Sequence, residues 1–419
     1  MSSFFARHFP ALTSRNFLIF WVGQFISLIG SWMQSTTLPY LAYRLSGRPF
    51  DLGLIGFSTT LPTLVLALPG GVLVERLEKR KIVIVLQTVM MFQAFGLAAL
   101  TFGGLIQIWH LVVLSFLLGC ATAVEITARQ SMLVEMVGKQ ALPNAIALQA
   151  MIFNLARVLG PSLTAAVLLL VEHGGEGWAF FLNGVSFLFV IVGLMFVRTP
   201  YQAERLPHQN NRMGAEFREG LRYISGNALV TAILLLAALI GFFGFPFVQQ
   251  IPALARDVLS VPNDTEALIK ARTSLLYLAQ GCGALAAALF LSVFSQMRRK
   301  GLFLTAGQFL FAAGLVLISF TRTLAAAIPL IIILGWGLVS QMATMNTLIQ
   351  VEVPDRLRGR VFSVYLWAVQ GVAPLGSLFI GGLAQLQGVP RAALVAGGIC
   401  LLAASLIHAR YPILRQKTV

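Results

Sequence analysis

The chain has 419 residues, of which 58% are hydrophobic and only 11% are charged. A soluble domain is typically about a quarter charged, so this composition excludes an ordinary soluble protein and indicates an integral membrane protein. At about 20 residues for each membrane-crossing helix plus short turns, the length accommodates about twelve such helices.

The formal net charge of +15 would suggest a nucleic-acid partner if the protein were soluble. Here the 30 lysine and arginine residues gather mainly in alternate turns between the apolar segments. This asymmetry follows the positive-inside rule, which assigns the basic turns to the cytoplasm. We therefore expect both termini to be cytoplasmic, and we expect no nucleic-acid partner.

Six apolar segments are predicted in the first half. The first, at about 16–43, carries a row of polar residues that includes Gln24 and Gln34, which suits a helix lining a cavity better than one facing lipid. The others cover about 52–74, the stretch from the charged turn 75–81 to about 105, 109–136, 143–171, and a segment that follows the turn 172–177 and ends near 197.

The longest polar stretch, 198–226, separates the two halves. Its part 213–224 has the spacing of an amphipathic helix, which we expect to lie along the membrane surface with its arginines at lipid headgroups. Six further spans are predicted at about 229–254, 273–294, 302–320, 325–350, 361–386 and 392–409. The expected fold is all-α, with twelve transmembrane helices in two six-helix bundles at 1–197 and 227–419 and a cytoplasmic linker at 198–226.

The two halves share a weak internal repeat. The stretches VEMV at 134–137 and LGPS at 159–162 recur as VEVP at 351–354 and LGSL at 375–378, about half a chain later. Two halves with the same topology are typical of transporters built from parallel repeats.

Three charged residues lie well inside predicted spans, more than one helical turn from either end, namely Glu125, Arg129 and Arg157. A charge in the membrane costs several kcal/mol and usually faces a bundle interior or a water-filled cavity. Arg129 lies one helical turn after Glu125 on the same face, and Arg157 on the next span is placed to approach both. We expect Glu125 to carry proton coupling, because every other acid is expected near a segment end or loop with access to water. A structural ion pair is the alternative.

Three stretches resemble one family of transporters. They are GVLVERLEKRK at 71–81, the segment 128–161 with ARQ, LPNA and NLARVLGP, and NTLIQ with VPDRLRGRV at 346–361. They are similar to the major facilitator superfamily, and within it to the drug:proton antiporter branch that includes bacterial macrolide efflux proteins and the enterobactin exporter. The resemblance covers essentially the whole chain and implies location in a bacterial inner membrane.

The resemblance implies roles for two of these stretches. Gly71, Glu75, Arg76 and Arg80 would form a cytoplasmic gate, although Glu75 replaces the usual aspartate and Glu78 a usual glycine. A basic loop that only sets topology is the alternative. Gly160 and Pro161 would form a helix kink associated with antiporters, where the outer and inner gates alternate.

The substrate cavity is expected along the first, fourth, seventh and tenth spans. Amides supply adaptable hydrogen bonds, and aromatic faces suit bulky, partly apolar or cationic solutes. The candidates are Gln24, Gln34, Gln249, Gln250, Gln341, Asn346, Tyr365 and Trp367, with Phe243 and Phe245. For any one aromatic residue, ordinary packing is the alternative.

The sequence favours a secondary-active exporter of a hydrophobic or amphipathic small molecule, such as a drug, macrolide or siderophore-like compound. A lysolipid or lipid flippase and a small-metabolite uptake carrier remain alternatives. We expect a monomer that uses protons as coupling ion and contacts membrane lipid. No enzyme motif, cofactor site or metal site is predicted, and the cysteines Cys120, Cys282 and Cys400 are too scattered for a disulfide framework.

Overall fold

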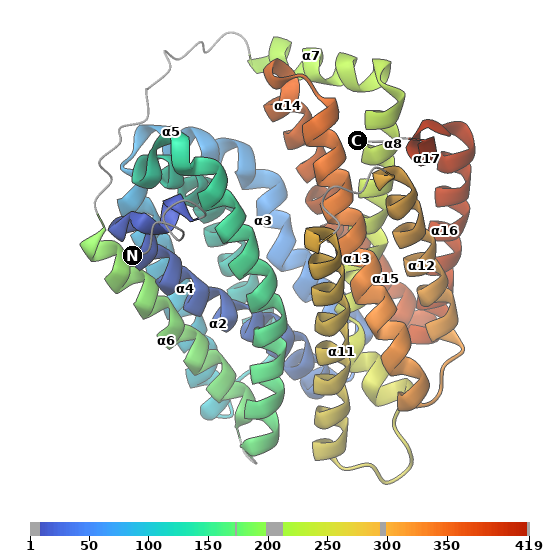
Figure 1. The fold of residues 1–419 in the computed structure, drawn as a ribbon. Coiled ribbons are helices and arrows are strands. Elements are labelled where there is room, and N and C mark those ends of the chain that lie inside the picture. Colours follow the sequence, from blue (N-terminus) through green and yellow to red (C-terminus); the bar gives the residue numbers. More distant parts are fainter. Residues whose placement is uncertain (1–8, 172–173, 198–212, 294–298, 417–419) are drawn as a thin grey trace. The chain divides into compact units, whose positions relative to one another are not determined.

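The computed structural model describes residues 9–171, 174–197, 213–293 and 299–416 (Figure 1). Within these ranges, the side chains of 67–73, 75–76, 139, 169, 213–217, 292–293, 355–356 and 416 are not described. In the described part of the chain, twelve helices are long and apolar enough to cross a membrane, which confirms the predicted fold class.

The backbone groups into two compact units. The first comprises residues 1–45 and 58–206, and the second comprises 46–57 and 207–419. The first part of the second membrane helix thus groups with the second unit.

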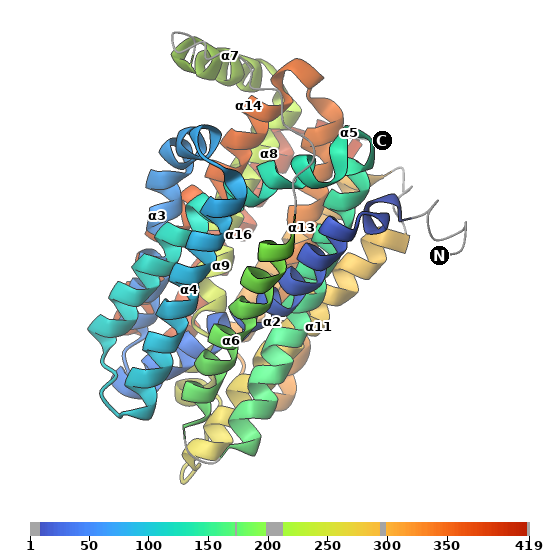
Figure 2. The same cartoon turned by 90° about the vertical axis from the view of Figure 1, so that its left-hand side faces the viewer.

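The first unit is built from long helices because its apolar runs exceed membrane thickness. The helices of this half of the chain are η1 Pro10–Thr13, α2 Arg15–Ser46, α3 Pro49–Arg76, α4 Lys79–Phe102, α5 Ile108–Leu170 and α6 Gly175–Phe196. Within the first unit, α2 lies between α6 and the second half of α5 (Figure 2).

Helix α5 contains two membrane spans, Ile108–Gly138 and Gln140–Leu168. The predicted turn between them is reduced to one non-helical residue, Gly138, with φ 72° and ψ 170°. A side chain with a Cβ rarely adopts this left-handed φ, so glycine at 138 allows the chain to change direction without a longer loop.

The second unit has a more interrupted helical pattern. Its elements are α7 Met213–Gly226, α8 Ala228–Leu239, η2 Ile240–Gly244, α9 Phe245–Val248, α10 Ile251–Ala253, η3 Leu254–Val258, α11 Glu266–Val293, α12 Lys300–Ser319, α13 Leu324–Glu352, α14 Asp355–Leu366, η4 Trp367–Gly371, α15 Ala373–Gln387, α16 Val389–Arg410 and α17 Ile413–Gln416. Three of them, η2, η3 and η4, are single π-helical turns, which are often found at functional sites.

The predicted amphipathic helix is α7, and it packs on the second unit. Glu219 forms an ion pair with Arg360 of α14, and the Tyr223 hydroxyl donates to the Glu352 carbonyl at 3.4 Å. The side chain of Asn227 then caps α8 by accepting from the Val230 N–H at 3.0 Å. Glu219 and Tyr223 of this helix therefore bind protein. That its arginines contact lipid headgroups stays a prediction.

Candidate functional site

The centre of the first unit holds a buried carboxylate. Glu125 on α5 is 4% exposed, and its Oε1 accepts from Gln87 Nε2 of α4 at 3.1 Å. Arg129 Nε donates to Oε1 and Oε2 of the same carboxylate at 3.0 and 3.3 Å. The spacing of four residues places both charges on one helix face, as the sequence predicted. The result is a buried ion pair with one amide donor.

Arg157 does not join this pair. Its guanidinium is 8% exposed and lies over the rings of Trp32, at 5.0 Å, and Phe153, at 5.6 Å. The two rings meet edge to face at 5.6 Å. Cation–π contacts of this kind are worth up to about 2 kcal/mol when desolvated. Among the described side chains, the N–H groups of Arg157 have no carboxylate partner.

A chain of buried amides joins α6, α2 and α4. Asn183 Nδ2 donates to Gln34 Oε1 at 2.8 Å, and Gln34 Nε2 donates to Gln93 Oε1 at 3.1 Å. All three residues are at most 2% exposed. Gln24, ten residues earlier on α2, is also buried, but its Oε1 lacks a hydrogen-bond partner. Gln34 therefore has a structural partner on each side, whereas Gln24 has a free acceptor.

The expectation that Glu125 alone lacks access to water is wrong. Glu176, in the first turn of α6, is 0% exposed, and Asp51, in the first turn of α3, is 7% exposed. Arg44 near the end of α2 lies 3.0 Å from Glu176 Oε1, without hydrogen-bond geometry. The sequence placed Glu176 in a turn, and nothing local signals that neighbouring helices cover it.

The basic turn after α3 ties the helix ends of the first unit together. Arg80 donates from Nε to the Leu194 carbonyl at 2.7 Å and from Nη2 to the Met195 carbonyl at 2.8 Å, which satisfies the end of α6. Lys79 forms an ion pair with Glu135 of α5. The side chains of the other three gate candidates, Gly71, Glu75 and Arg76, lie outside the described residues.

Gly160 is a point of close helix contact. A Cβ built there would lie 3.0 Å from both Ile29 O and Met33 N of α2, and nearer still to Trp32 Cβ. The backbone stays helical through Gly160 and Pro161, and the only non-helical residue inside α5 is Gly138. The structure thus gives Gly160 a packing role in addition to the kink that the resemblance implies.

Two glutamines of the second unit contact the segment 46–57. Gln250 is 1% exposed, and its Nε2 donates to the Pro49 carbonyl at 3.3 Å. Gln249 lies against Gly56, and neither Oε1 of the pair has a partner. The side-chain oxygens of both glutamines are therefore unpaired acceptors that lie near the first part of α3.

The other candidates of the second unit differ in burial. Gln341 is held between α13 and α12 by donating to Gly337 O at 2.8 Å and Gly307 O at 3.2 Å. The Tyr365 hydroxyl donates to Met342 O at 3.1 Å, and Asn346 accepts from Gln350. Phe243 is buried, Phe245 is half-buried, and Trp367 is 58% exposed. These residues come from α13, α14, η2, α9 and η4, and the described contacts do not join them into one cluster.

Sequence reasoning missed a buried histidine. His408, in the last turn of α16, is 1% exposed, and its Nε2 lies 2.7 Å from Gln308 Oε1 of α12. A cavity of about 20 Å³ lined by Gln308, Gln341 and Cys400 lies in the same unit. His408 stands at a segment end in the sequence, and only the packing of α12 on α16 shows its burial.

Twelve membrane-length helices in the described residues are those of a multi-pass membrane protein, and the first unit adds a buried ion pair and a chain of buried amides. The chain belongs to the transmembrane secretion effector family of major facilitator transporters, whose model matches residues 6–418. It is 22% identical over 388 residues to macrolide efflux protein A of Streptococcus pyogenes, covering 92% of this chain and 93% of that protein. It is 24% identical over 391 residues to the enterobactin exporter EntS of Salmonella choleraesuis, covering 92% and 89%.

A solved structure shows the same fold. A bacterial homolog of the human lysosomal transporter Spinster, in an inward-facing and unoccupied conformation, superimposes with a TM-score of 0.71 at 16% identity. The match covers 96% of this chain and 98% of that one. Family and relatives are transporters and not enzymes, which confirms both the predicted family and the predicted absence of an enzyme activity.

Proposed function

We propose that this protein is a proton-coupled exporter of a hydrophobic or amphipathic small molecule that works by alternating access. The observation that carries the proposal is the buried pair of Glu125 and Arg129 inside a membrane span. A buried pair is expensive to desolvate and is often no more stable than an apolar replacement. Its presence is therefore better explained by a charge that changes during transport.

The geometry suggests how a proton acts at this pair. When Glu125 is ionised, its carboxylate neutralises Arg129 and accepts from Gln87. A proton added at Oε2, whose bond from Arg129 is the longer one, makes the carboxyl neutral and weakens the charge-assisted bond. Arg129 is then available to another acceptor, and release of the proton from Glu125 restores the carboxylate and the pair.

The substrate class rests on the relatives and on the polar groups. One relative is named for macrolide efflux and another for enterobactin export. Within the first unit, Arg157 with two aromatic rings and the free acceptor of Gln24 suit a large solute with both apolar and polar parts. We propose that the protein resides in a bacterial inner membrane as a monomer with both termini cytoplasmic.

Transport by purified protein in proteoliposomes, with and without an imposed pH gradient, tests the proposal. A macrolide and enterobactin are the first solutes to try. Glu125→Gln is expected to abolish gradient-driven accumulation while substrate binding and passive exchange persist. Glu266→Gln, which alters a half-exposed acid paired with Arg256, is the matched control and is expected to behave as the parent does.

Three outcomes would contradict the proposal. If Glu125→Gln accumulates substrate against the gradient as well as the parent, the pair is structural. If Glu176→Gln alone abolishes coupling, the proton site lies at the Arg44 end of the unit. Export that ignores the pH gradient in the parent would reject proton coupling altogether.

A further inference from the structure

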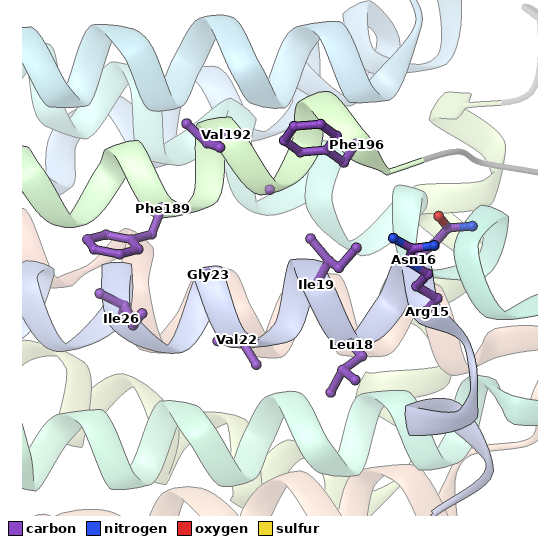
Figure 3. Close-up of a pocket in the computed structure, with 11 residues that line it drawn as sticks. Arg15, Asn16, Leu18, Ile19, Val22, Gly23, Ile26, Phe189, Val192 and Phe196 are labelled. Carbon is purple, nitrogen blue, oxygen red and sulfur yellow. The ribbon is translucent and has the colours of Figure 1, made fainter.

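An apolar groove runs between α2 and α6 of the first unit. Its volume is about 930 Å³, near the upper end of the roughly 300–1,000 Å³ usual for small-molecule sites. Figure 3 shows its lining side chains along the two helices. The apolar part is formed mainly by Leu18, Val22, Ile26, Phe189, Val192 and Phe196.

The groove is open to its surroundings. Val22 is 45% exposed, Phe189 is 51% exposed and Phe196 is 71% exposed. These side chains lie on helices that are long and apolar enough to cross a membrane, so their exposed surface faces lipid hydrocarbon and not water. An acyl chain is the apolar partner that a bilayer supplies in excess.

One end of the groove is positively charged. Arg15, the first residue of α2, is exposed at this end, and Phe196 lies there at the end of α6 (Figure 3). The N-terminus of α2 adds the positive end of a helix dipole. The carbonyls of Leu194 and Met195, which would repel an anion, are occupied by Arg80. An anionic group is therefore favoured at the Arg15 end and nowhere else along the groove.

The length of the groove matches one leaflet. From Arg15 to Ile26 the helix rises about 16 Å at roughly 1.5 Å per residue. Half of a hydrocarbon core about 30 Å thick is about 15 Å. A lipid with its headgroup at Arg15 would thus extend one acyl chain to the far end of the groove at Ile26 and Phe189.

We propose that this groove is a binding site for one phospholipid with an anionic headgroup. The phosphate pairs with Arg15, and an acyl chain packs along Val22 and between the exposed phenylalanines. This site goes beyond the proposed export function, because it requires neither a proton nor a transported substrate.

The experiment uses the full-length protein in nanodiscs that contain phosphatidylglycerol with a photoreactive group at the middle of one acyl chain. Cross-linked peptides are identified by mass spectrometry. Label is expected on the segments that contain Val22 and Phe189. The competing lipids are unlabelled phosphatidylglycerol and phosphatidylcholine, and phosphatidylglycerol is expected to displace the probe more effectively.

Two substitutions separate headgroup from chain. Arg15→Gln is expected to reduce the preference for phosphatidylglycerol about fivefold, the effect of one basic side chain at an anionic lipid surface. Arg299→Gln, at an exposed arginine that precedes another membrane helix, is the matched control and should leave the preference unchanged. Val22→Trp fills the groove and should lower labelling to the level found on helices elsewhere, with folding checked by size-exclusion chromatography.

The proposal is overturned if label spreads evenly over all spans, because the groove then holds ordinary bilayer lipid. Equal competition by both lipids, or equal effects of Arg15→Gln and Arg299→Gln, would reject the anionic headgroup. A dimer in native mass spectra that Val22→Trp dissociates would show that a second copy of the chain occupies the groove. All of these results are independent of transport activity, so failure here would not affect the proposed export function.

Discussion

Removing Arg129 tests whether the Glu125 carboxylate depends on its partner. Arg129→Met keeps the apolar volume of the side chain and removes every donor. The carboxylate, 5% exposed as a side chain, would then keep only the Gln87 amide. Because water does not reach it, the lost interaction is not replaced by solvation.

Substituting Arg129 and substituting Glu125 should cost different amounts of unfolding free energy. Breaking a buried pair by removing one partner costs about 3–5 kcal/mol, which we expect for Arg129→Met. Glu125→Gln keeps an acceptor for both donors and leaves Arg129, which is 16% exposed, so the cost is about 1–2 kcal/mol. The double variant should be more stable than the sum predicts, with a coupling energy of about 2 kcal/mol.

The free energy of unfolding is measured in mixed detergent micelles for the parent, both single variants and the double variant. A second cycle on Lys79 and Glu135 is the control. That pair joins α4 to α5, whereas Glu125 and Arg129 lie on one helix, and its side chains are 18% and 14% exposed. Its coupling energy should be about 1 kcal/mol or less, because partial solvation weakens an ion pair.

The reasoning is refuted if Arg129→Met costs no more than Lys79→Met. Equal costs would mean that Glu125 is solvated in the protein, and the proton-coupling argument would lose its physical basis.

Three further predictions follow from single contacts. Gly160→Ala forces its new methyl group into α2 and should cost about 1–3 kcal/mol in unfolding free energy, whereas Gly96→Ala, whose Cβ would meet nothing within 4 Å, should be neutral or stabilising. Gln34→Leu leaves two buried amide partners unsatisfied at about 1–3 kcal/mol each, whereas Gln24→Leu should change stability little, and comparing the two melting temperatures checks this. Hydrogen bonds from Arg272 and the Val261 N–H hold the pKa of Asp264 below its usual range, so its stabilisation is present above the unfolded pKa of about 4 and is lost as pH falls through the folded pKa. The difference in melting temperature between Asp264→Asn and parent should therefore begin to shrink below pH about 4 and disappear only below the lower, folded pKa.

The membrane spans and the Glu125–Arg129 pair could be predicted from the sequence because each depends only on residues that are close together along the chain. Each membrane span is a run of about 20 apolar residues, and hydropathy alone locates it. The Glu125–Arg129 pair follows from a spacing of four residues on a helix. The turn at Gly138 was placed correctly but expected to be longer, since sequence does not show that one left-handed residue suffices.

Other features depend on packing between distant segments. Gln24 and Gln34 lie on the same helix in similar surroundings, yet only Gln34 meets Asn183 and Gln93. Glu176 stands in a short polar turn, the usual place for a solvated acid, and becomes buried because other helices cover it. No pattern within one segment can reveal such partners.

The distribution of buried charge separates the two units. Among the described residues, the buried acidic and basic side chains of the first unit are Glu125, Arg157 and Glu176, whereas those of the second are Asp51 and His408. His408 pairs with the neutral amide of Gln308, so the polar groups beside it do not require a fixed charge. A proton that changes a buried charge in the first unit alters strong electrostatic interactions, because the dielectric constant there is low. The neutral amides of Gln308 and Gln341 in the second unit can change hydrogen-bond partners by reorienting. Under the proposed function, in which Glu125 carries the proton, neutral substitutions at Gln308 or Gln341 should alter which solutes are exported while leaving the dependence on the pH gradient intact.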